Sequence, residues 1–466
     1  MNSVVGVPFT MRTAAACLGG ALHPQCDERE IITSVSIDSR AIGQGGLFVP
    51  LVGRYADGHD YIQQALDAGA LLALAAEDQA ERIFGQIGRS YQQRILIVDD
   101  PLLALHRLAR WYVDRRDRLV KIAVTGSNGK TTTKEILASI LECEYPVFKT
   151  AGNYNSVIGV PVGVFGLTDE HRYAVFELAM SERGEMAALA RIVFPDVAVL
   201  TNIGVAHIGN IGSQQGIAEE KKAIFSCFTG RQRAFLPEDE PYYDFLAEGV
   251  HGQVVPFGVH HTPGYRAVED LGLDGLRLRW GDREVVFALP GMHNLSNLLA
   301  AVSVAVELGA APESVLQGIA RVQAPFGRGQ ILRGEVTIIQ DCYNANPDSM
   351  LAALEFFRAV PATGRKIAVL GDMRELGETA GNEHRRILAE VAGCDRLFLV
   401  GEEFLRAAGG SHPDRDMGSS PADIVDELLA YLKPGDLVLL KGSRGVGLEV
   451  ISERIQHAQQ FGGARC

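Results

Sequence analysis

The stretch from Gly126 to Thr132, GSNGKTT, has the residue types and spacing of a phosphate-binding site. The apolar run Ile122–Val124 before it predicts a β-strand, and the apolar residues at 136, 137, 140 and 141 predict one face of a helix after it. A strand that turns through glycines into a helix directs backbone N–H groups and the positive end of the helix dipole at one point, where phosphate binds. A glycine-rich turn that only caps a helix is the weaker alternative, because a Lys and two Thr follow the second Gly.

Two side chains of this loop add chemistry. Lys130 would place a positive charge on the β- and γ-phosphates, and Thr131 would offer a hydroxyl to Mg²⁺. The pattern is the short G-x-x-G-K-T-T, because Val124 stands where the longer form of this loop has its first glycine. By itself the loop predicts binding of a nucleoside triphosphate and leaves the reaction open.

Polar residues also follow two other predicted strands. Glu177 ends the strand-like run Tyr173–Leu178, and His207 comes shortly after the run Val197–Asn202. The carboxyl ends of strands face the ligand crevice of an open α/β sheet, so Glu177 is a candidate Mg²⁺ ligand. The alternatives are a solvated acid at Glu177 and, at His207, a loop histidine with a structural hydrogen bond.

Two helical stretches carry further candidates. The helix predicted over 217–228 holds Lys221 and Lys222, and adjacent lysines on a helix are usually solvated. The helix predicted over 291–308 holds Asn294 and Asn297, which are three apart and share a face near its start. Their amides could bind the edge of a base, or Asn294 could simply cap the helix.

The remaining segments predict the architecture. Strands at 71–76 and 95–98 and helices at 61–68 and 102–113 indicate a small α/β domain, followed by a charged hinge at 115–118. Residues 230–286 suggest a β-rich insertion. Strands at 336–340, 366–370, 396–400 and 436–440 alternate with helices, which predicts a mostly parallel, Rossmann-like sheet. We therefore expect three domains of class α/β, at 1–117, 118–326 and 327–466.

Composition restricts the class of protein. The 466-residue chain has a net charge of -13, which argues against a nucleic-acid or anionic-membrane surface. Its seven cysteines form no C-x-x-C pair, and no apolar run reaches the length of a membrane span. We expect a cytoplasmic protein with reduced thiols and no nucleic-acid partner.

The loops of the first domain gather polar residues that form either a ligand site or an ordinary surface: Asp38, Ser39, Arg40, Arg54, Asp57 and His59.

Several motifs occur in one order along the chain: TGSNGKTT, Glu177, Ala206-His207 before a Lys-bearing helix, GMHNLSN at 291–297 and GRG at 327–329. Together they resemble the Mur ligase family of ATP-dependent, amide-forming enzymes. SIDSR at 36–40 with GLFVPLVGRYADGHDY at 46–61, DCYNANPDSM at 341–350 and GDMRELGE at 371–378 resemble the branch that adds a dipeptide. The resemblance implies that D-Ala-D-Ala is joined to UDP-MurNAc-tripeptide through an acyl phosphate, for peptidoglycan synthesis. The alternatives are a cyanophycin-synthetase-like or folylpolyglutamate-type ligase, and a phosphate-loop switch without ligase chemistry.

The resemblance also implies roles for residues. It implies catalytic roles for Lys130, Lys221 and His207, and two Mg²⁺ sites formed by Thr131, Glu177, His207 and a carbamylated Lys221. It places ATP at Gly126, Ser127, Asn128, Gly129, Lys130, Thr131 and Thr132, with Asn294 and Asn297 at the adenine, Arg328 at the phosphates and Asp341 at the ribose. It assigns Asp38, Ser39, Arg40 and the 53–59 loop to the UDP end and Asn153 and Asn155 to substrate. It offers Asn344, Asn346, Asp348 and Asp372 as candidates near the dipeptide.

The resemblance further implies a monomer that closes its domains. Ala179, Ser181, Gly209 and Ala223 depart from the usual residues of the family, and these positions surround the metal and the acceptor peptide.

Overall fold

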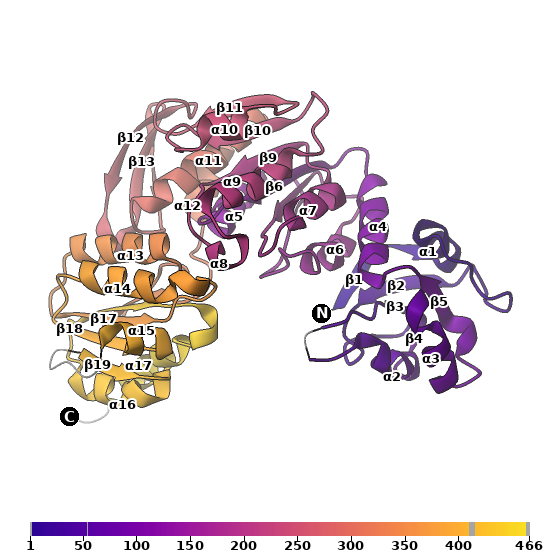
Figure 1. Cartoon of the computed structure of the whole chain (residues 1–466). Helices are drawn as coiled ribbons and strands as arrows, with labels where there is room; N and C mark the ends of the chain where they lie inside the picture. Colours follow the sequence, from indigo (N-terminus) through magenta and orange to yellow (C-terminus); the bar gives the residue numbers. More distant parts are fainter. Residues whose placement is uncertain (1, 54, 410–414, 463–466) are drawn as a thin grey trace.

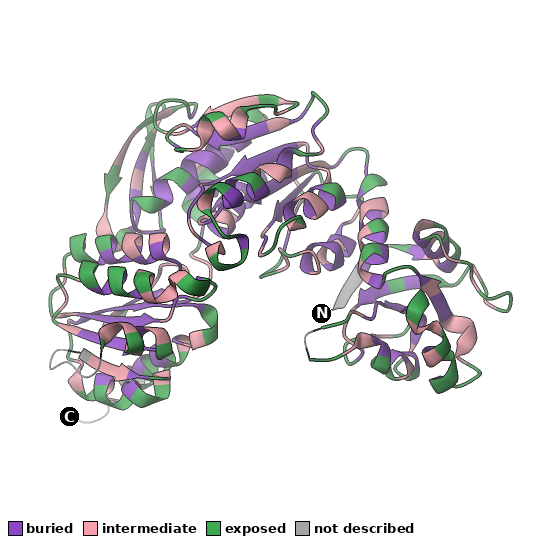
Figure 2. Cartoon of the chain, viewed as in Figure 1, coloured by how far each residue is buried: buried purple, intermediate pink, exposed green. Residues whose placement is uncertain are grey.

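The computed structural model describes residues 2–53, 55–409 and 415–462 of the chain. Three α/β parts follow one another and form an arch, with the N-terminal part at one foot and the C-terminal part at the other (Figure 1). This confirms the predicted class, an α/β protein of three domains. Most strands are buried, whereas the outer faces of the helices are exposed (Figure 2).

The N-terminal part is a five-stranded sheet of order β1-β2-β3-β4-β5. β1 pairs antiparallel with β2 and the other pairs are parallel. The strands are β1 Asn2–Thr10, β2 Ile31–Ser36, β3 Gly46–Phe48, β4 Ala70–Ala76 and β5 Ile95–Val98, and the helices are α1 Met11–Leu18, α2 Ile62–Asp67, α3 Ala80–Gln86 and α4 Pro101–Asp114. The predicted helices at 61–68 and 102–113 and the strands at 71–76 and 95–98 are confirmed. Sequence reasoning missed β1 and α1.

The end of α4 fastens this part to the central one. The Tyr112 hydroxyl accepts a hydrogen bond from the Val7 N–H at 2.7 Å and donates one to the Leu167 carbonyl at 2.9 Å. The buried Arg116 guanidinium donates to the carbonyls of Tyr112 and Leu167. Within the predicted charged hinge at 115–118, the charge of Arg116 is therefore bonded inside the junction.

The central sheet has the order β11-β10-β9-β6-β8-β7, and all its pairs are parallel. Its strands are β6 Val120–Thr125, β7 Val147–Lys149, β8 Tyr173–Glu177, β9 Val197–Leu200, β10 Arg233–Pro237 and β11 Gln253–Phe257. The helices are α5 Lys130–Leu141, α6 Gly159–Gly163, α7 Glu185–Val193, α8 Ile208–Ile211, α9 Gln214–Lys222, α10 Tyr243–Ala247, α11 His293–Glu307 and α12 Pro312–Arg321.

The segment 230–286 differs from the prediction of one β-rich insertion. β10 and β11 extend the parallel sheet, because their apolar residues, such as Phe235, are buried in the core under α11. Only β12 Tyr265–Asp270, β13 Leu276–Trp280 and β14 Arg283–Phe287 form a separate antiparallel sheet. The helix predicted over 217–228 also ends early, at Lys222, and continues as a 3-10 turn over Ala223–Phe225.

The C-terminal part confirms the mostly parallel sheet, with the order β15-β16-β20-β17-β18-β19. Only β15 Gln330–Leu332 runs antiparallel to its neighbour β16 Thr337–Asp341 in the described part of this sheet. The other strands are β17 Lys366–Gly371, β18 Arg396–Val400, β19 Arg415–Gly418 and β20 Leu437–Lys441. The helices are α13 Pro347–Ala359, α14 Ala380–Glu390, α15 Glu402–Ala408, α16 Pro421–Tyr431 and α17 Glu449–Gly462. Among the described residues, no helix combines the length and apolar character needed to cross a membrane.

Candidate active site

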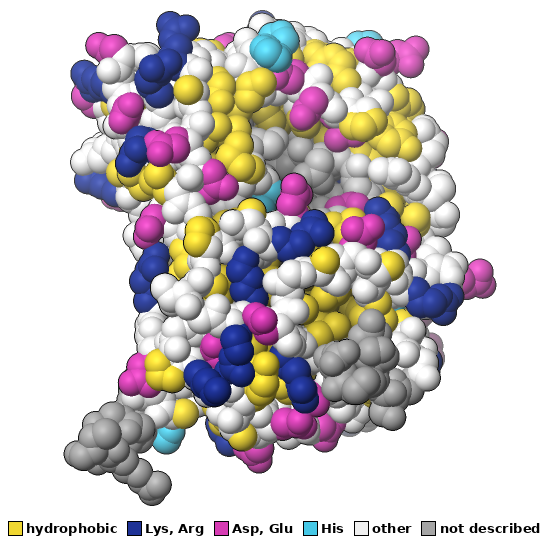
Figure 3. All heavy atoms as spheres, turned by 90° about the vertical axis from the view of Figure 1, so that its left-hand side faces the viewer, with side chains coloured by type: hydrophobic (Ala, Val, Ile, Leu, Met, Phe, Trp, Pro, Cys, Tyr) yellow, Lys and Arg dark blue, Asp and Glu magenta, His cyan; other side chains and the backbone are white. Residues whose placement is uncertain are grey.

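A cavity of about 750 Å³ lies between the central and C-terminal parts. The loops after β6, β8 and β9, three adjacent strands, open into it, as expected for the carboxyl ends of a parallel sheet. Figure 3 shows that this face of the molecule is hollowed, with acidic side chains and a histidine at the hollow. Of the residues predicted for the site, the cavity is lined by Ser127, Asn128, Gly129, Lys130, Thr131, Thr132, Asn153, Asn155, Glu177, His207, Asn294, Asn297, Arg328, Asp341, Asn344, Asn346 and Asp348.

The phosphate loop needs its two glycines. Gly126 and Gly129 have φ of 146° and 80°, in the left-handed region that side chains disfavour. A Cβ on Gly126 would also collide with Thr201, and one on Gly129 with Asn297. Gly129 is the N-cap of the 12-residue helix α5 and has no side chain to bond the first N–H groups of the helix, so these are available to an anion.

Lys130 is held inside this loop. Its Nζ donates to the carbonyls of Gly126 at 2.7 Å and Ser127 at 3.2 Å. Removal from water, opposed by the Glu177 charge and assisted by the Arg328 charge, lowers the pKa of Lys130 to about 8. A phosphate bound here would stabilise the ammonium form, because an opposite charge favours the charged state of the lysine.

The Glu177 carboxylate and the Thr131 hydroxyl lie together next to the phosphate loop. The Thr131 hydroxyl donates to Glu177 Oε2 at 2.8 Å, and Asn155 Nδ2 donates to Glu177 Oε1 at 2.9 Å. The buried ammonium of Lys134 lies 3.8 Å from Oε2. Carboxylate and hydroxyl oxygens are the ligands that Mg²⁺ prefers, so the donor set fits this ion. The described residues contain no group of three or more His, Cys, Asp or Glu placed to hold a metal, so such an ion would also need phosphate oxygens, water or a modified side chain.

His207 follows β9 and faces the C-terminal part. It has a left-handed backbone, with φ 65°, and its Nδ1 lies 2.7 Å from Oε2 of Glu375. This contact lowers the pKa of the Glu375 carboxyl. Because this contact joins two domains and no metal ligation is shown by it, the metal role of His207 and the alternative of a loop histidine with a structural contact both stay predictions.

Lys221 is buried behind the phosphate loop rather than solvated, and only 1% of it is exposed. Its Nζ donates to the Gly126 carbonyl at 3.0 Å. Burial, followed by the charge of Lys130, lowers the pKa of Lys221 well below its ordinary value. Lys222 points elsewhere and donates to the Phe245 carbonyl at 2.6 Å.

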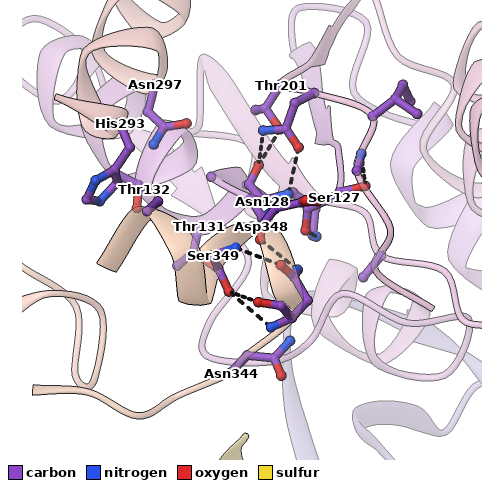
Figure 4. A pocket seen from close by; sticks show the side chains of 18 of the residues that line it. Ser127, Asn128, Thr131, Thr132, Thr201, His293, Asn297, Asn344, Asp348 and Ser349 are labelled. Carbon is purple, nitrogen blue, oxygen red and sulfur yellow. Dashed lines mark hydrogen bonds between the residues drawn. The ribbon is translucent and has the colours of Figure 1, made fainter. Parts of the chain in front are cut away.

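Asn294 and Asn297 lie together at the start of α11, which begins at His293 with Met292 as a cap that makes no side-chain bond. The capping alternative is therefore wrong. Asn294 Nδ2 donates to the Pro290 carbonyl at 2.8 Å, and Asn297 Nδ2 donates to Asn294 Oδ1 at 3.2 Å. Figure 4 shows Asn297 and His293 on one side of the phosphate loop, with Asn344 and Asp348 on the other.

The C-terminal part supplies charged groups at the cavity wall. Asp341, at the end of β16, lies 2.8 Å from Lys441 Nζ at the end of β20. The Arg328 guanidinium stacks 4.3 Å from the centre of the Tyr343 ring. Arg328 and Lys441 line the cavity from the C-terminal part and Lys130 lines it from the central part, so both parts contribute positive charge to one cavity.

The loop before α13 touches the central part directly. Asn346 Nδ2 donates to Asn128 Oδ1 at 2.8 Å, and Asp348 Oδ2 accepts from the Val205 N–H at 3.1 Å. Asn344 lines the same cavity, and its carbonyl accepts from Lys441 Nζ at 2.8 Å. The predicted substrate residues of this loop are thus brought to the phosphate loop.

Other predicted residues lie apart from the cavity. Asp38 pairs with Arg40 at 2.8 Å, and the Ser39 hydroxyl donates to Gln64 at 3.0 Å, all within the N-terminal part. Asp57 binds His59 Nδ1 at 2.7 Å, whereas Arg54 lies outside the described residues. Asp372 does not reach the cavity, because its carboxylate accepts the N–H groups of Glu403 and Phe404 at the start of α15.

Sequence reasoning missed several residues of the cavity wall. Glu375 stands in the GDMRELGE stretch but received no role, and Lys441 ends a strand just as Asp341 does. Asn202 also lines the cavity, and its Oδ1 accepts from the Asn128 N–H at 2.9 Å. Position at a strand end was a usable signal for Asn202 and Lys441, whereas no local pattern distinguishes Glu375.

Comparisons with known proteins cover the same three parts. Family models match in order: the Mur ligase family catalytic domain at 31–118, the Mur ligase middle domain at 124–305 and the Mur ligase glutamate ligase domain at 327–444. The UDP-N-acetylmuramoyl-tripeptide–D-alanyl-D-alanine ligase of Treponema pallidum is 40% identical over 91% of this chain and 94% of its own.

Solved structures agree with these matches. A crystal structure of MurF from Acinetobacter baumannii superimposes with a TM-score of 0.88 at 29% identity, over 97% of this chain and all of that one. MurF ligase from Thermotoga maritima, solved in complex with ADP, superimposes with a TM-score of 0.79 at 28% identity, over 91% of this chain and 97% of that one.

Proposed function

The chain belongs to the Mur ligase family, and we propose that it is the ATP-dependent ligase that joins D-alanyl-D-alanine to UDP-N-acetylmuramoyl-tripeptide. The product is a pentapeptide precursor of peptidoglycan. The names of the relatives support this reaction, and the ADP complex of a relative supports the nucleotide. The structural observation that carries the proposal is that the phosphate loop and the loop before α13 line one cavity from two domains.

The reaction follows from this two-sided arrangement. A carboxylate oxygen of the tripeptide attacks the γ-phosphorus of ATP, the bond to the β-phosphate oxygen breaks, and ADP and an acyl phosphate form. The amine of the dipeptide then attacks the acyl carbon, passes through a tetrahedral intermediate, loses a proton and expels inorganic phosphate. The first step brings two anions together, and the second develops an oxyanion and expels phosphate, so the site must supply positive charge.

Lys130 and the start of α5 supply that charge at the phosphates. Lys130 is held by two carbonyls of the loop and lines the cavity, where it would contact the γ-phosphate. Thr131, Glu177 and His207 would hold Mg²⁺, in up to two sites, which would neutralise charge on the transferred phosphoryl group. Asn155 and Lys134 keep the Glu177 carboxylate in place for this role.

Lys221 is the proposed site of carbamylation. A carbamate forms when a neutral amine attacks carbon dioxide and loses a proton. Burial and the neighbouring Lys130 favour the neutral amine of Lys221, which meets that requirement. The carbamate would convert a buried cation into an anion that can order a metal beside the phosphate loop.

The three domains, 1–117, 118–326 and 327–466, would hold the UDP end, ATP and the dipeptide respectively. Asp38, Ser39 and Arg40 would contact the UDP end, and Asn153 with Asn155 the acceptor side of the cavity. Asn294 and Asn297 would contact adenine, Arg328 the phosphates and Asp341 the ribose, while Asn344, Asn346 and Asp348 would contact the dipeptide. We propose a monomer in the cytoplasm, where reducing conditions suit the six free cysteines of the described chain.

A substrate-omission assay tests the function. Phosphate release should require ATP, UDP-MurNAc-tripeptide and D-Ala-D-Ala together, and Lys130→Ala should abolish it. Release that continues without the dipeptide or the UDP substrate would contradict the proposal and favour a phosphate-loop switch. The relatives do not favour the cyanophycin-synthetase-like or folylpolyglutamate-type alternatives, which the same assay would reveal by turnover with other amino-acid acceptors.

A further inference from the structure

Two residues with left-handed backbone meet where the central and C-terminal parts touch. His207 and Glu375 both have φ of 65°, and Phe194 is the other non-glycine residue with positive φ in the described chain. His207 Nδ1 lies 2.7 Å from Glu375 Oε2, and both side chains line the cavity. A strained backbone persists only where its surroundings hold it, and such positions cluster at functional sites.

The surroundings that hold this pair are backbone contacts. The Gly209 N–H donates to the Glu375 carbonyl at 3.2 Å, and a Cβ on Gly209 would lie 2.5 Å from the Gly377 nitrogen. Ile208 packs against the apolar core of the C-terminal part. Figure 1 shows α8, which begins at Ile208, at the junction of the two parts. Gly209 therefore permits an approach that a side chain would prevent.

We propose that Glu375 is a positioning residue that orients His207 toward a divalent cation in the cavity, and that it acts only while the two parts are docked. The proposal rests on the proposed role of His207 as a metal ligand. The Glu375 carboxylate lies at ion-pair distance from Nδ1 without the alignment of a hydrogen bond, and its negative charge favours a proton on Nδ1, which leaves the lone pair of Nε2 for a metal. Glu375 belongs to the other domain, so docking completes the cation site.

A simple ion pair that only joins the domains is the competing explanation. It predicts that loss of Glu375 loosens the docking, and that cation affinity falls only as far as the docking is lost. The positioning role predicts lower cation affinity while the docking stays intact. Docking would persist because it is also held by the hydrogen bonds of Gly209, Asn346 and Asp348. Docking and cation binding can therefore be measured separately in one set of variants.

The experiment is Mn²⁺ titration of the full chain with ADP present, in which free Mn²⁺ is measured by electron paramagnetic resonance. Hydrogen–deuterium exchange of residues 203–212 measures docking in the same samples. Glu375→Ala should weaken Mn²⁺ binding about 10–100-fold with unchanged exchange. Glu375→Gln should weaken it less, because the amide oxygen keeps a partial negative charge beside Nδ1. Unchanged Mn²⁺ affinity in Glu375→Ala, or a loss that appears only with faster exchange, would overturn the proposal.

His207→Asn separates the failure of this inference from that of the proposed function. If His207→Asn weakens Mn²⁺ binding and Glu375→Ala does not, only the role of Glu375 is wrong. If His207→Asn has no effect, His207 is no metal ligand, and both the metal role and this inference are wrong. Ligase activity in the substrate-omission assay would still stand in either case.

Gly209→Ala tests the dependence on docking without touching either side chain of the pair. The variant should exchange faster over 203–212 and lose Mn²⁺ affinity by a similar factor. Gly381→Ala is the matched control, because a Cβ there meets only Arg385 at 3.6 Å or more, and it should behave as the wild type. Wild-type Mn²⁺ affinity in a Gly209→Ala chain whose exchange rises would overturn the dependence on docking, and unchanged exchange would overturn the inference that Gly209 permits the close approach.

Discussion

Asn346 Nδ2 donates a hydrogen bond to Asn128 Oδ1 at 2.8 Å, which joins the first turn of α13 to the phosphate loop. The same side chain caps α13, because its Oδ1 accepts the Ser349 N–H at 2.9 Å. Asn128 is held from the other side by Asn202, whose Oδ1 accepts its N–H at 2.9 Å. One asparagine of the C-terminal part therefore both starts a helix and steadies the loop that would bind the γ-phosphate.

These two roles of Asn346 can be separated. Asn346→Ala should lose the cap, at about 1 kcal/mol of stability, together with the bridge. Asn346→Ser should keep the cap, because serine is an equally good N-cap residue, but it cannot reach Asn128. Both should lower kcat/KM for ATP about 3–10-fold, as expected for one lost hydrogen bond. Thermal unfolding and steady-state kinetics measure the two effects, and wild-type kinetics in Asn346→Ser would show that the bridge has no role.

The pH dependence should show the lowered pKa of Lys130, about 8 in the free protein. Below pH 8 the ammonium is present and attracts phosphate. Above pH 8 the proton is lost, so kcat/KM for ATP should fall and approach a tenfold loss per pH unit. The bend in kcat at saturating ATP should lie at higher pH, because bound phosphate favours the charged lysine. Identical bends in both profiles, or none up to pH 9.5, would contradict this assignment.

The sequence predicted those parts of the site that local patterns determine. Short stretches of sequence predicted the turn from β6 through GSNGKTT into α5. They also predicted the acid at the end of β8, because both features depend only on the order of residue types over a few positions. The burial of Lys221 did not follow, because a helix pattern does not show which face packs behind the phosphate loop. The contacts of Asn346 and Glu375 depend on how two domains dock, and no local period carries that information. β10 and β11 were misread because each has only five residues, and so short an apolar run does not show which strands it pairs with.

Lys134 should be important for stability. Its ammonium is buried, lies 3.1 Å from Glu135 and 3.8 Å from Glu177, and donates to the Thr150 carbonyl at 2.8 Å. Lys134→Met would leave the buried Glu177 carboxylate without its cation, which typically costs about 3–5 kcal/mol. Lys149→Met is the control, because the half-exposed Lys149 pairs with Glu135 at 2.9 Å and should cost about 0–1 kcal/mol. Urea unfolding measures both, and equal losses would contradict a special role for Lys134.

Lys221 and its neighbour Lys222 offer a matched test of the carbamate. Lys221 is buried against the Gly126 carbonyl, whereas Lys222 contacts the Phe245 carbonyl and ring. With ¹³C-labelled bicarbonate, wild type and Lys222→Ala should show a carbamate carbon signal by NMR, and Lys221→Ala should not. Lys221→Ala should lower kcat about 10–100-fold, the range seen when a residue that supports a metal is lost.

A short carboxylic acid should partly restore Lys221→Ala, because it replaces the lost anion, and it should not change Lys222→Ala. Full activity in Lys221→Ala would exclude the carbamate. A loss that no carboxylic acid restores, with the carbon signal absent in wild type, would instead assign Lys221 a purely structural role behind Gly126.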